Sequence, residues 1–333
     1  MRIETAIFVL CFLLIVIQQS PAVSLGERGM QSSGNTTFYI DQQNGNDEYN
    51  GLSPDSAWKS LSNVNTLNFQ AGDSILFKSN CVWNGNIRPN GSGKPGNPIV
   101  MSQYGSGEKP IINGGGELYT LFIYNQEYWE ISNLEITNYN ENDPNSYKTG
   151  VYIQARDAGE MHHIHLLNLI IHDVNGNIES GNASKNNGGI YFQIKGDSEP
   201  TFFNDILIQG CHIYDVDRTG ISLSSEWDNR TLHTNSNWTP SQNVVIRNNM
   251  IERTGGNGLI WRVTYRPLVE YNIFHECATR LSGNAMFFFN CDSALAQYNE
   301  AYLTVYEPGE TDAGAFDADY RCKNTIYQYE KKC

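Results

Sequence analysis

The sequence predicts an all-β chain folded as a single-stranded parallel β-helix, a solenoid of stacked coils, with a helix capping its N-terminal end. The first observation is a repeat. From residue 150 onward a Gly or Asn precedes a short run of alternating apolar residues, with anchors at Gly150, Gly189, Gly220, Gly258, Asn284 and Gly314. The second observation is that each interval, 26 to 39 residues long, holds another alternating segment in the same place. The third is that strands this short cannot bury a face alone, so each coil must stack on its neighbours.

The composition indicates a folded protein and is compatible with a glycan as its partner. The chain has 333 residues, of which 40% are hydrophobic and 17% charged, and its formal net charge is −14. This apolar content excludes a disordered chain. The acidity argues against a nucleic-acid partner, because affinity for phosphate backbones comes from clustered Lys and Arg.

The N-terminus predicts an export signal. An apolar run at 6–17 follows Arg2, and Ala22-Val23-Ser24 has the small-x-small pattern of a cleavage site. The run is shorter than the roughly 20 residues that a membrane span needs. We therefore expect residues 1–24 to be a signal peptide, and the mature chain from Leu25 to be secreted and free of the membrane. Glycosylation acceptor triplets, used if the source is a eukaryote, occur at Asn35, Asn90, Asn182, Asn229 and Asn237.

The elements before the repeat form an expected cap. Ser53-Pro54-Asp55 followed by Trp58, Leu61 and Val64 predicts one N-capped helix with Pro in its first turn. A solenoid needs its open end covered, so this helix is expected to cap it. Strands are predicted at 74–78, 99–104 and 110–113.

The repeat then predicts one domain over 25–333, with the cap at about 38–90 and regular coils at about 110–333. The second segments of the coils lie at 131–136, 164–171, 206–213, 244–251, 268–274, 295–301 and from 326 onward. The chain stops at Cys333 directly after a strand. Either a partner protects that strand or this is a shortened version of a longer protein.

Several motifs resemble a known group. The entry segment of secreted right-handed parallel β-helix proteins, pectin-lyase-like in fold, is similar to Tyr39-Ile40-Asp41, Asn44-Gly45-Asn46-Asp47, Gly51-Leu52-Ser53-Pro54, Ala57-Trp58-Lys59-Ser60-Leu61 and the run at 71–77. The runs at 312–320 and 324–329 resemble β-helical glycoside hydrolases of the kind that includes fucosidases and xylanases. The resemblance covers nearly all of the mature chain. It implies a right-handed solenoid, whereas activity is implied less strongly, because one fold carries many chemistries.

Strand alternation then predicts a sugar-binding face. Aligning Cys291 with Cys322 pairs Phe287 with Ala318 and Phe289 with Tyr320 as inward positions, so the alternate residues point outward. Coils about 4.8 Å apart would present donors and rings in step with an extended glycan. The predicted substrate-binding residues are Arg156, Tyr191, Lys195, Glu226, Trp227, Arg262, Phe288 and Arg321. The same alignment brings Cys291 and Cys322 within disulfide range, and leaves open whether they are bonded.

The candidate catalytic residues are carboxylates at the end of this face. Asp317 and Asp319, two residues apart on a strand, share a face with Cα atoms roughly 6.5 Å apart, and Asp312 precedes them. Glycosidases need two carboxyls about 5 to 9.5 Å apart. We predict Asp317 and Asp319 as acid and base, with Arg321 and Arg262 binding substrate or stabilising charge. A calcium site or turn capping by Asp are alternative roles of the pair.

Three functions remain open at this point. A secreted polysaccharide hydrolase that is monomeric and needs no cofactor is favoured. A lyase acting on a uronate would use an Arg or Lys base and add calcium, and a solvated face without catalysis would make the chain a glycan-binding or structural β-helix. No metal site is expected: the histidines, including His163 and His165, are interpreted as surface groups. Asn133, Asn168 and Asn248 share one turn column, which predicts a stacked amide ladder.

Overall fold

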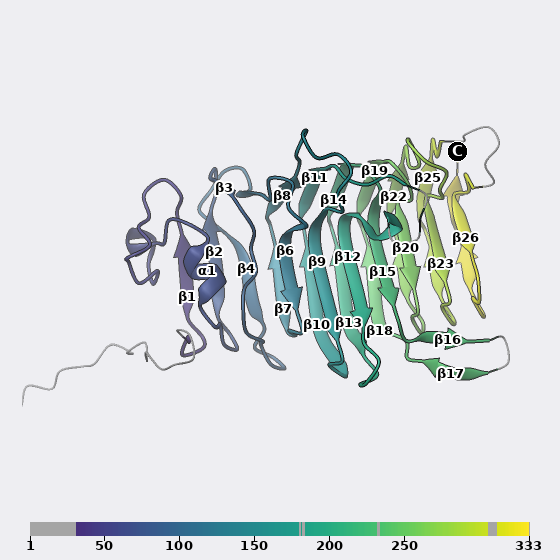
Figure 1. The fold of residues 1–333 in the computed structure, drawn as a ribbon, viewed down its shortest axis with the longest axis horizontal. Helices are drawn as coiled ribbons and strands as arrows, with labels where there is room; N and C mark the ends of the chain where they lie inside the picture. The colour runs from purple at the N-terminus through teal and green to yellow at the C-terminus, as the bar shows by residue number, and fades with distance from the viewer. Residues whose placement is uncertain (1–30, 180, 182–183, 232–233, 306–311, 333) are drawn as a thin grey trace, which may run out of the picture.

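The computed structural model describes residues 31–179, 181, 184–231, 234–305 and 312–332, and these form one elongated stack of coils (Figure 1). The strands pair in parallel into sheets of ten, nine and seven strands, called here sheets 1, 2 and 3. Within each sheet, neighbouring strands come from successive coils. This arrangement confirms the predicted parallel β-helix.

The three sheets take most of the chain. Sheet 1 contains β1 (Thr37–Ile40), β2 (Ser74–Lys78), β4 (Ile99–Tyr104), β7 (Trp129–Ser132), β10 (Glu160–Leu167), β13 (Phe202–Gln209), β18 (Gln242–Arg247), β21 (Leu268–Glu270), β24 (Leu295–Gln297) and β27 (Ile326–Gln328). Sheet 2 contains β3 (Val82–Asn84), β5 (Ile111–Asn113), β8 (Glu135–Asn138), β11 (Ile170–Val174), β14 (His212–Val216), β19 (Met250–Thr254), β22 (Ile273–His275), β25 (Glu300–Tyr302) and β28 (Lys331–Lys332). Sheet 3 contains β6 (Tyr119–Tyr124), β9 (Thr149–Arg156), β12 (Gly188–Lys195), β15 (Thr219–Ser225), β20 (Leu259–Arg262), β23 (Met286–Phe289) and β26 (Phe316–Ala318).

Each predicted second segment is in fact two strands, one in sheet 1 and one in sheet 2. The corner between them holds two residues, and the first has positive φ: Asn133 at 55°, Asn168 at 53°, Gly210 at 67° and Asn248 at 55°, followed by Tyr271, Tyr298 and Tyr329 at 55° to 56° in the last three coils. Asn and Gly tolerate this left-handed conformation better than other residues. The turn column predicted from the asparagines is therefore the corner that separates two of the three sheets.

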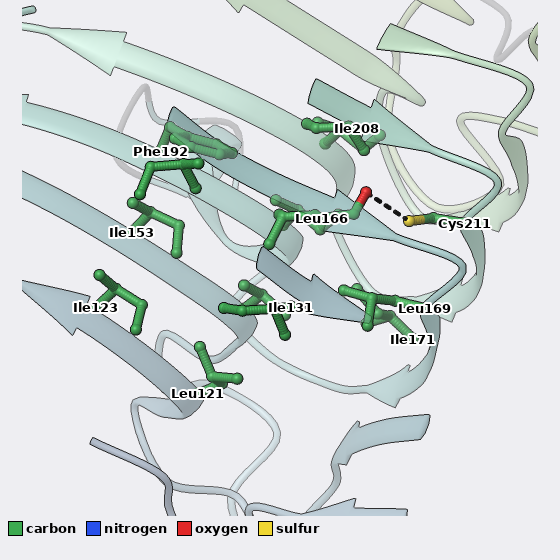
Figure 2. Packing of buried hydrophobic residues seen from close by; sticks show 14 of the residues in the cluster. Leu121, Ile123, Ile131, Ile153, Leu166, Leu169, Ile171, Phe192, Ile208 and Cys211 are labelled. Atoms are coloured by element: carbon green, nitrogen blue, oxygen red, sulfur yellow. Dashed lines mark hydrogen bonds between the residues drawn. The ribbon is translucent and has the colours of Figure 1, made fainter. Parts of the chain in front are cut away.

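Inward side chains form one continuous apolar core. Figure 2 shows Ile123, Ile153 and Phe192 of sheet 3 facing Ile131 and the other aliphatic residues of sheet 1. These four named residues are buried. Burial on this scale, at about 25 cal/mol per Å² of apolar surface, supplies the main driving force for stacking.

The amide ladder exists, but one residue beyond the predicted column. Asn249, Asn272 and Asn299 point inward at the start of successive turns and are buried. The Oδ1 of Asn272 accepts from the backbone and side-chain amides of Asn249, at 3.0 and 2.9 Å, and the Oδ1 of Asn299 does the same for Asn272. Each amide thus satisfies the backbone of its neighbour, which buried polar groups require.

The predicted single helix is wrong. The chain forms a 3₁₀ turn, η1 (Pro54–Ser56), and a separate helix, α1 (Ser62–Thr66), beside the first coils. Trp58 lies between them and pairs with β1: its N–H donates to Tyr39 at 2.9 Å, and its carbonyl accepts from Asp41 at 2.8 Å. Strand pairing therefore overrides the helical pattern. The hydroxyl of Ser53 makes no capping hydrogen bond.

The predicted strand register at the last coil is also wrong, by one residue. Phe287 pairs with Asp317 and Phe288 with Ala318, whereas Asp292 pairs with Lys323. The last coil thus holds one extra residue between these points. Because a slip of one residue moves every side chain to the other face, Phe288 points into the core with 0% exposure, and Phe287 points outward.

The structure also shows the state of the cysteines and the exposure of the predicted glycosylation acceptors. The five cysteines that the structure describes are free thiols, including Cys291 and Cys322, so the considered disulfide is not formed. The Sγ of Cys322 instead lies 3.2 Å from the carbonyl of Phe288. The acceptors Asn35, Asn90, Asn229 and Asn237 are exposed. The predicted signal peptide at 1–24 and Asn182 lie outside the described residues.

Candidate active site

The outer face of sheet 3 carries the predicted row of side chains in register. From β6 to β26, one column of paired outward residues runs through Phe122, Tyr152, Tyr191, Ser222, Ile260, Phe287 and Asp317. Neighbouring strands lie about 4.8 Å apart. The sequence therefore predicted correctly that distant segments share one face, and Asp317 keeps its predicted outward place.

This face is covered over its middle strands. Tyr191, Ser222, Ile260 and Phe287 point away from the core, yet they are only 6%, 1%, 0% and 5% exposed. The segment between β11 and β12, which contains η2 (Ser184–Asn186), packs on β15. The predicted face is thus no open trough along its full length.

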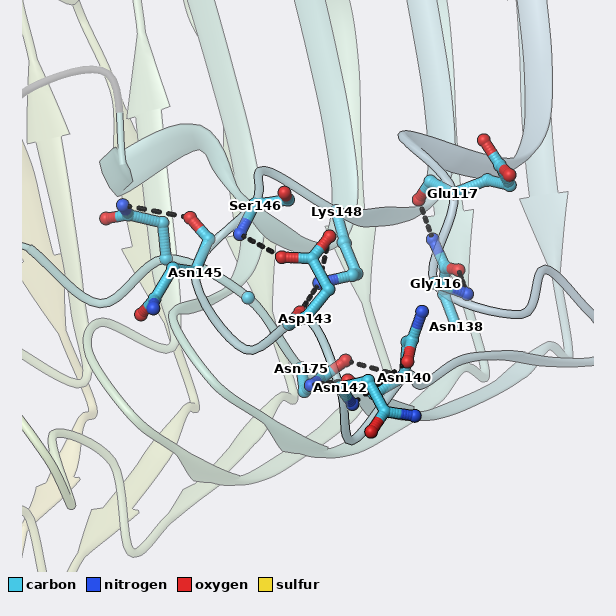
Figure 3. Close-up of polar contacts among 12 residues, drawn as sticks. Gly116, Glu117, Asn138, Asn140, Asn142, Asp143, Asn145, Ser146, Lys148 and Asn175 are labelled. Atoms are coloured by element: carbon cyan, nitrogen blue, oxygen red, sulfur yellow. Dashed lines mark hydrogen bonds and ion pairs between the residues drawn. The ribbon is translucent and has the colours of Figure 1, made fainter.

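Asparagines hold the covering segment to the coil before it. The side chain of Asn175 accepts from the N–H of Asn140 at 2.9 Å and donates to its carbonyl at 2.8 Å. Asn187 accepts from the backbone N–H of the buried Lys148. Figure 3 shows Asn140, Lys148 and Asn175 together where the turns after sheet 2 approach sheet 3. Because these contacts bond side chain to backbone, the position of the segment is fixed by the coils beneath it.

Three cations gather beneath and beside this segment. Arg262 donates through Nη1 to the side chain of Asn186 at 2.9 Å and to the carbonyl of Leu223 at 3.0 Å. Burial lowers the pKa of Arg262 and of Arg218 to about 10 each. The pKa of Lys185 is lowered by burial first and then by Arg218 and Arg262, so the three positive charges act on one another.

Arg218 is the most unusual of the three. Its side chain is 1% exposed, and its Nε and Nη1 have no hydrogen-bond partner in the part of the chain that the structure describes. It extends past Gly256, where an added Cβ would lie 1.7 Å from Nη1. An unsatisfied buried donor costs about 1 to 3 kcal/mol, more for a charged group. Such a group calls for a functional explanation.

Carboxylates face these cations from the last coil. Asp319 and Asp312 both act to raise the pKa of Lys185, and Asp319 does so for Arg262. The pKa of Asp317 is raised, by burial first and then by the negative charges of Asp319 and Asp312. Asp317 is half-buried, whereas Asp312 and Asp319 are exposed. The pKa of the acid Asp317 is thus raised, whereas the pKa values of the bases Lys185, Arg218 and Arg262 are lowered. Shifted pKa values of this kind are common in catalytic sites.

The other predicted substrate residues lie at the margins. Arg156 is exposed, with its Nε 3.8 Å from the carboxylate of Asp157, and Lys195 is paired with it on the next strand. Glu226 is exposed and accepts from the N–H of Gly196 at 2.8 Å. Arg321 lies over the ring of Tyr320, 4.6 Å from its centroid. None of these contacts joins the acid and cation group.

Trp227 corrects a further expectation. It is 5% exposed and belongs to the apolar core rather than to the outer face. It directly precedes the hairpin of β16 (Asp228–Arg230) and β17 (Asn235–Trp238), where the chain leaves the regular coil. Strand alternation therefore does not extend to this position.

Sequence reasoning missed Lys185, Arg218 and two outward phenylalanines. Lys185 lies in the covering segment and Arg218 at a corner, so neither belongs to an alternating strand. Phe287 and Phe289 were placed inward because of the register slip. Phe289 stands beside Tyr320, with ring centroids 5.5 Å apart, next to the carboxylates.

The chain is similar in sequence and in fold to lacto-N-biosidases. No family model matches the chain. It is 27% identical to a lacto-N-biosidase from Bifidobacterium longum subsp. longum, over 91% of this chain and 24% of that protein. Two crystal structures of a GH136 lacto-N-biosidase from Eubacterium ramulus, native and selenomethionine derivative, superpose with a TM-score of 0.80 each, at 28% and 27% identity, over 90% of this chain and 56% of theirs.

These comparisons confirm the resemblance to β-helical glycoside hydrolases that the sequence motifs predicted. The chain spans about a quarter of the length of the B. longum protein and just over half of that of the E. ramulus protein. Of the helices in the described residues, none has the length and apolar character to cross a membrane.

Proposed function

We propose that this chain is a glycoside hydrolase and that its reaction takes place at the C-terminal end of the outer face of sheet 3. One observation carries the proposal: Asp319 acts on both Arg262 and Lys185, Asp312 acts on Lys185, and Asp317 lies near both of these acids, on a face that is otherwise covered. The similarity to lacto-N-biosidases, at 27% to 28% identity over nine tenths of the chain, supports the same reaction class.

Asp319 is proposed as the nucleophile or base. It is the carboxylate that acts on both Arg262 and Lys185, so it lies on the side of the acid group nearest these cations. During cleavage the sugar ring gains positive character, which an adjacent carboxylate stabilises.

The proton for the departing sugar comes from Asp317 or Asp312, and a separate observation supports each. Asp317 has the raised pKa that a general acid needs. Asp312 faces Lys185 together with Asp319, as a partner across the same space would. Strand geometry places the Cα atoms of Asp317 and Asp319 about 6.5 Å apart, compatible with either stereochemical outcome.

The charge balance favours hydrolysis over elimination. A lyase needs positive charge free to neutralise the substrate's carboxylate. Here Asp312 and Asp319 act on Lys185, and Asp319 acts on Arg262, so these two cations already face negative charge. A neutral glycan fits such a site, and we propose one that carries a lacto-N-biose unit, the unit in the names of the similar proteins. Phe289 and Tyr320 offer rings for the sugar faces.

Product analysis of the full chain tests the proposal. Incubated with neutral and uronate-containing glycans, the protein should release a saccharide with a plain reducing end, detected by mass spectrometry. Asp319→Asn should lower the rate by at least about 10³-fold. The matched control is Asp215→Asn, an exposed carboxylate on sheet 2 paired with Arg253 at 2.7 Å, which should retain full activity. An unsaturated, ultraviolet-absorbing product would make the chain a lyase, and full activity of Asp319→Asn would remove this site from catalysis.

Activated substrates distinguish Asp317 from Asp312. An aryl glycoside with a good leaving group needs little help from an acid. The Asn variant of the true acid should therefore lose activity on the natural linkage but keep much of it on the aryl glycoside. The other variant should show similar, smaller losses on both.

Export, monomeric state and independence from cofactors complete the proposal. Protein recovered outside expressing cells should begin near Leu25 and elute as a monomer in size-exclusion chromatography. Because carboxylates carry the proposed chemistry, the turnover rate should be unchanged by a chelator.

A further inference from the structure

A second group of chemically active side chains lies on the outer face of sheet 1, away from the carboxylates of sheet 3. It consists of Glu130 on β7, His163 and His165 on β10, and Asp205 on β13. One potential ligand atom from each of Glu130, His163 and His165 lies within 4.8 Å of the other two. These three side chains and Asp205 are called the histidine cluster below.

Strand register explains how three coils build this cluster. His165 pairs directly with Glu130 on the preceding strand, so the two stand side by side on the outer face. His163 occupies a left-handed position, with φ of 54°, in line with Asp205 at 70° on the next coil. Such positions are uncommon for residues other than Gly. The turn at His163 lets a second imidazole join the first, and their ring centroids are 3.8 Å apart.

The hydrogen bonds of the cluster are those of a metal site with its supporting groups. The Nδ1 of His163 lies 2.7 Å from Asp205, and its Nε2 lies 3.0 Å from the Oε1 of Glu130. The Nε2 of His165 lies 2.9 Å from the other oxygen of Asp205. Metal-binding histidines commonly place their second nitrogen on a carboxylate, which fixes the ring and raises its basicity.

In the part of the chain that the structure describes, no Lys or Arg pairs with the carboxylates of the histidine cluster. Within the described residues, the ion-pair partners of Glu130 and Asp205 are only the histidines of the cluster. Glu127 and Glu160 add further negative charge beside it, each with an oxygen within 3.4 Å of the ring of His162. A divalent cation would therefore bind to a negatively charged surface.

We propose that the histidine cluster binds one Zn²⁺-type transition ion through Glu130, His163 and His165, with solvent as a further ligand and Asp205 orienting the imidazoles. Two nitrogens and a carboxylate oxygen suit zinc and its neighbours better than calcium or magnesium, which prefer oxygen alone. The ion ties β7 to β10, and Asp205 extends the link to β13. Its role is to stabilise three consecutive coils, and the proposed hydrolysis does not depend on it.

A second group of the same composition serves as an internal control. On sheet 2, Glu252 lies between His212, at 3.0 Å, and His275, at 3.2 Å, with one carboxylate oxygen on each ring. Arg253 occupies the same carboxylate at 2.9 Å. Because the two imidazoles are on opposite oxygens and a guanidinium already neutralises the charge, this group is not expected to bind the ion.

Zinc titration of the full chain after chelator treatment tests the proposal. Calorimetry should show one Zn²⁺ per chain, and saturating Zn²⁺ should raise Tm by a few degrees. His163→Gln combined with His165→Gln should abolish both effects, Asp205→Asn should weaken binding about 10- to 100-fold, and His212→Gln combined with His275→Gln should change neither.

Two results would overturn the assignment. One is a wild-type protein that binds Zn²⁺ no better than the His163/His165 double variant. The other is equal loss of binding in the His212/His275 variant. Absorption of bound Co²⁺ gives an independent readout, since a site with nitrogen ligands yields visible bands that the double variant should lack. Glycan hydrolysis, measured in parallel, is expected to be equal with and without Zn²⁺, so failure of one proposal leaves the other testable.

Discussion

Two buried arginines, Arg230 and Arg218, differ in how completely their hydrogen-bond donors are satisfied. Their side chains are 0% and 1% exposed, and burial lowers the pKa of each guanidinium. Arg230 is the last residue of β16, at the turn end of the β16–β17 hairpin, and Arg218 lies at the corner before β15. They differ in what surrounds the charge.

Each of the three guanidinium nitrogens of Arg230 has a hydrogen-bond partner. Its Nε donates to Asn290 at 2.6 Å, its Nη1 contacts Asp292 at 3.1 Å, and its Nη2 donates to the carbonyls of Cys291 and Arg321. Its guanidinium also lies 3.9 Å from the ring centroid of Trp238. These contacts fasten the hairpin to the last two coils.

Arg218 has two nitrogens without partners in the described residues and lies near enough to Lys185 to lower its pKa. A buried charge left incomplete is a cost that folding alone does not justify. The satisfied buried charge of Arg230 therefore has a structural role, whereas under the proposed function a substrate would complete the hydrogen bonds of Arg218.

Arg230→Met should cause the largest change. Removing the guanidinium deprives Asp292 of its cation and the Oδ1 of Asn290 of its buried donor. Breaking such a buried charge network costs about 3 to 5 kcal/mol, a Tm loss on the order of 10 °C. Thermal unfolding measures it. Arg247→Met, which removes a half-buried guanidinium bonded to Gln209 at 2.7 Å, should cost under about 1 kcal/mol. Equal Tm values for the two variants would contradict the structural role of Arg230.

Asn272→Ala tests how much a buried polar group with complete hydrogen bonds contributes to stability. The side chain of Asn272 bonds to Asn249, to Asn299 and to the carbonyl of Ile246 at 2.9 Å, all within the buried ladder. Its removal leaves several buried groups unpaired, and we expect a loss of about 2 to 3 kcal/mol in the free energy of unfolding. Denaturant titration measures this, with the exposed Asn142→Ala as control, expected within about 0.5 kcal/mol of wild type. A cost as small as that of the control would show that the ladder is dispensable.

How far the sequence predicts these features depends on whether periodicity governs the residue. The anchors Gly150, Gly189 and Gly220 lie in β9, β12 and β15, because inward residues must be apolar at every second position whatever the loops do. The shared face and the outward place of Asp317 follow from the same rule. Periodicity also places His163 and His165 on one face, but pairing across coils is needed to bring Glu130 to them.

Features that periodicity does not govern were missed or wrong. Arg218 and Lys185 lie in a corner and in an inserted segment, where packing against other coils decides the position. Phe288 was misplaced because the alignment through Cys291 and Cys322 is correct at the turn but not along the strand, which holds one residue more. Trp58 prefers pairing with β1 to the helix that its spacing indicates.

Arg218→Met tests the buried guanidinium whose hydrogen bonds are incomplete. Replacing an incompletely paired buried charge by an apolar side chain of similar length is often neutral or stabilising, by about 1 to 2 kcal/mol here. Glycan hydrolysis should nevertheless fall about 10- to 100-fold, equivalent to about 1.4 to 2.7 kcal/mol of transition-state binding. Unfolding curves and initial rates on the same preparations separate the two effects. A variant destabilised as strongly as Arg230→Met would instead give Arg218 a structural role.

Asp317→Asn should produce the smallest change in stability, and the sign of that change distinguishes the proposed site from the scaffold. The pKa of Asp317 is raised above its ordinary value of 3.8 by burial and by its acidic neighbours. The native state therefore holds the proton more tightly than the unfolded chain, so stability from this group is present below about pH 4 and is lost as pH rises through the native pKa. Asn does not titrate, and Asp317→Asn should gain about 1 °C in Tm over wild type between about pH 4 and pH 7.

Asp143 supplies the opposite case. Its pKa is lowered, by a hydrogen bond from Ser146 first and by Lys148, and Figure 3 shows it between these two residues. The unfolded chain holds this proton more tightly, so the contribution of Asp143 appears above about pH 4 and is lost as pH falls. Asp143→Asn should therefore lose stability relative to wild type over the pH range in which Asp317→Asn gains it. Tm series from pH 3 to 8 compare the two variants directly, and a shift of the same sign in both would show that Asp317 is held like an ordinary scaffold carboxylate and not under repulsion.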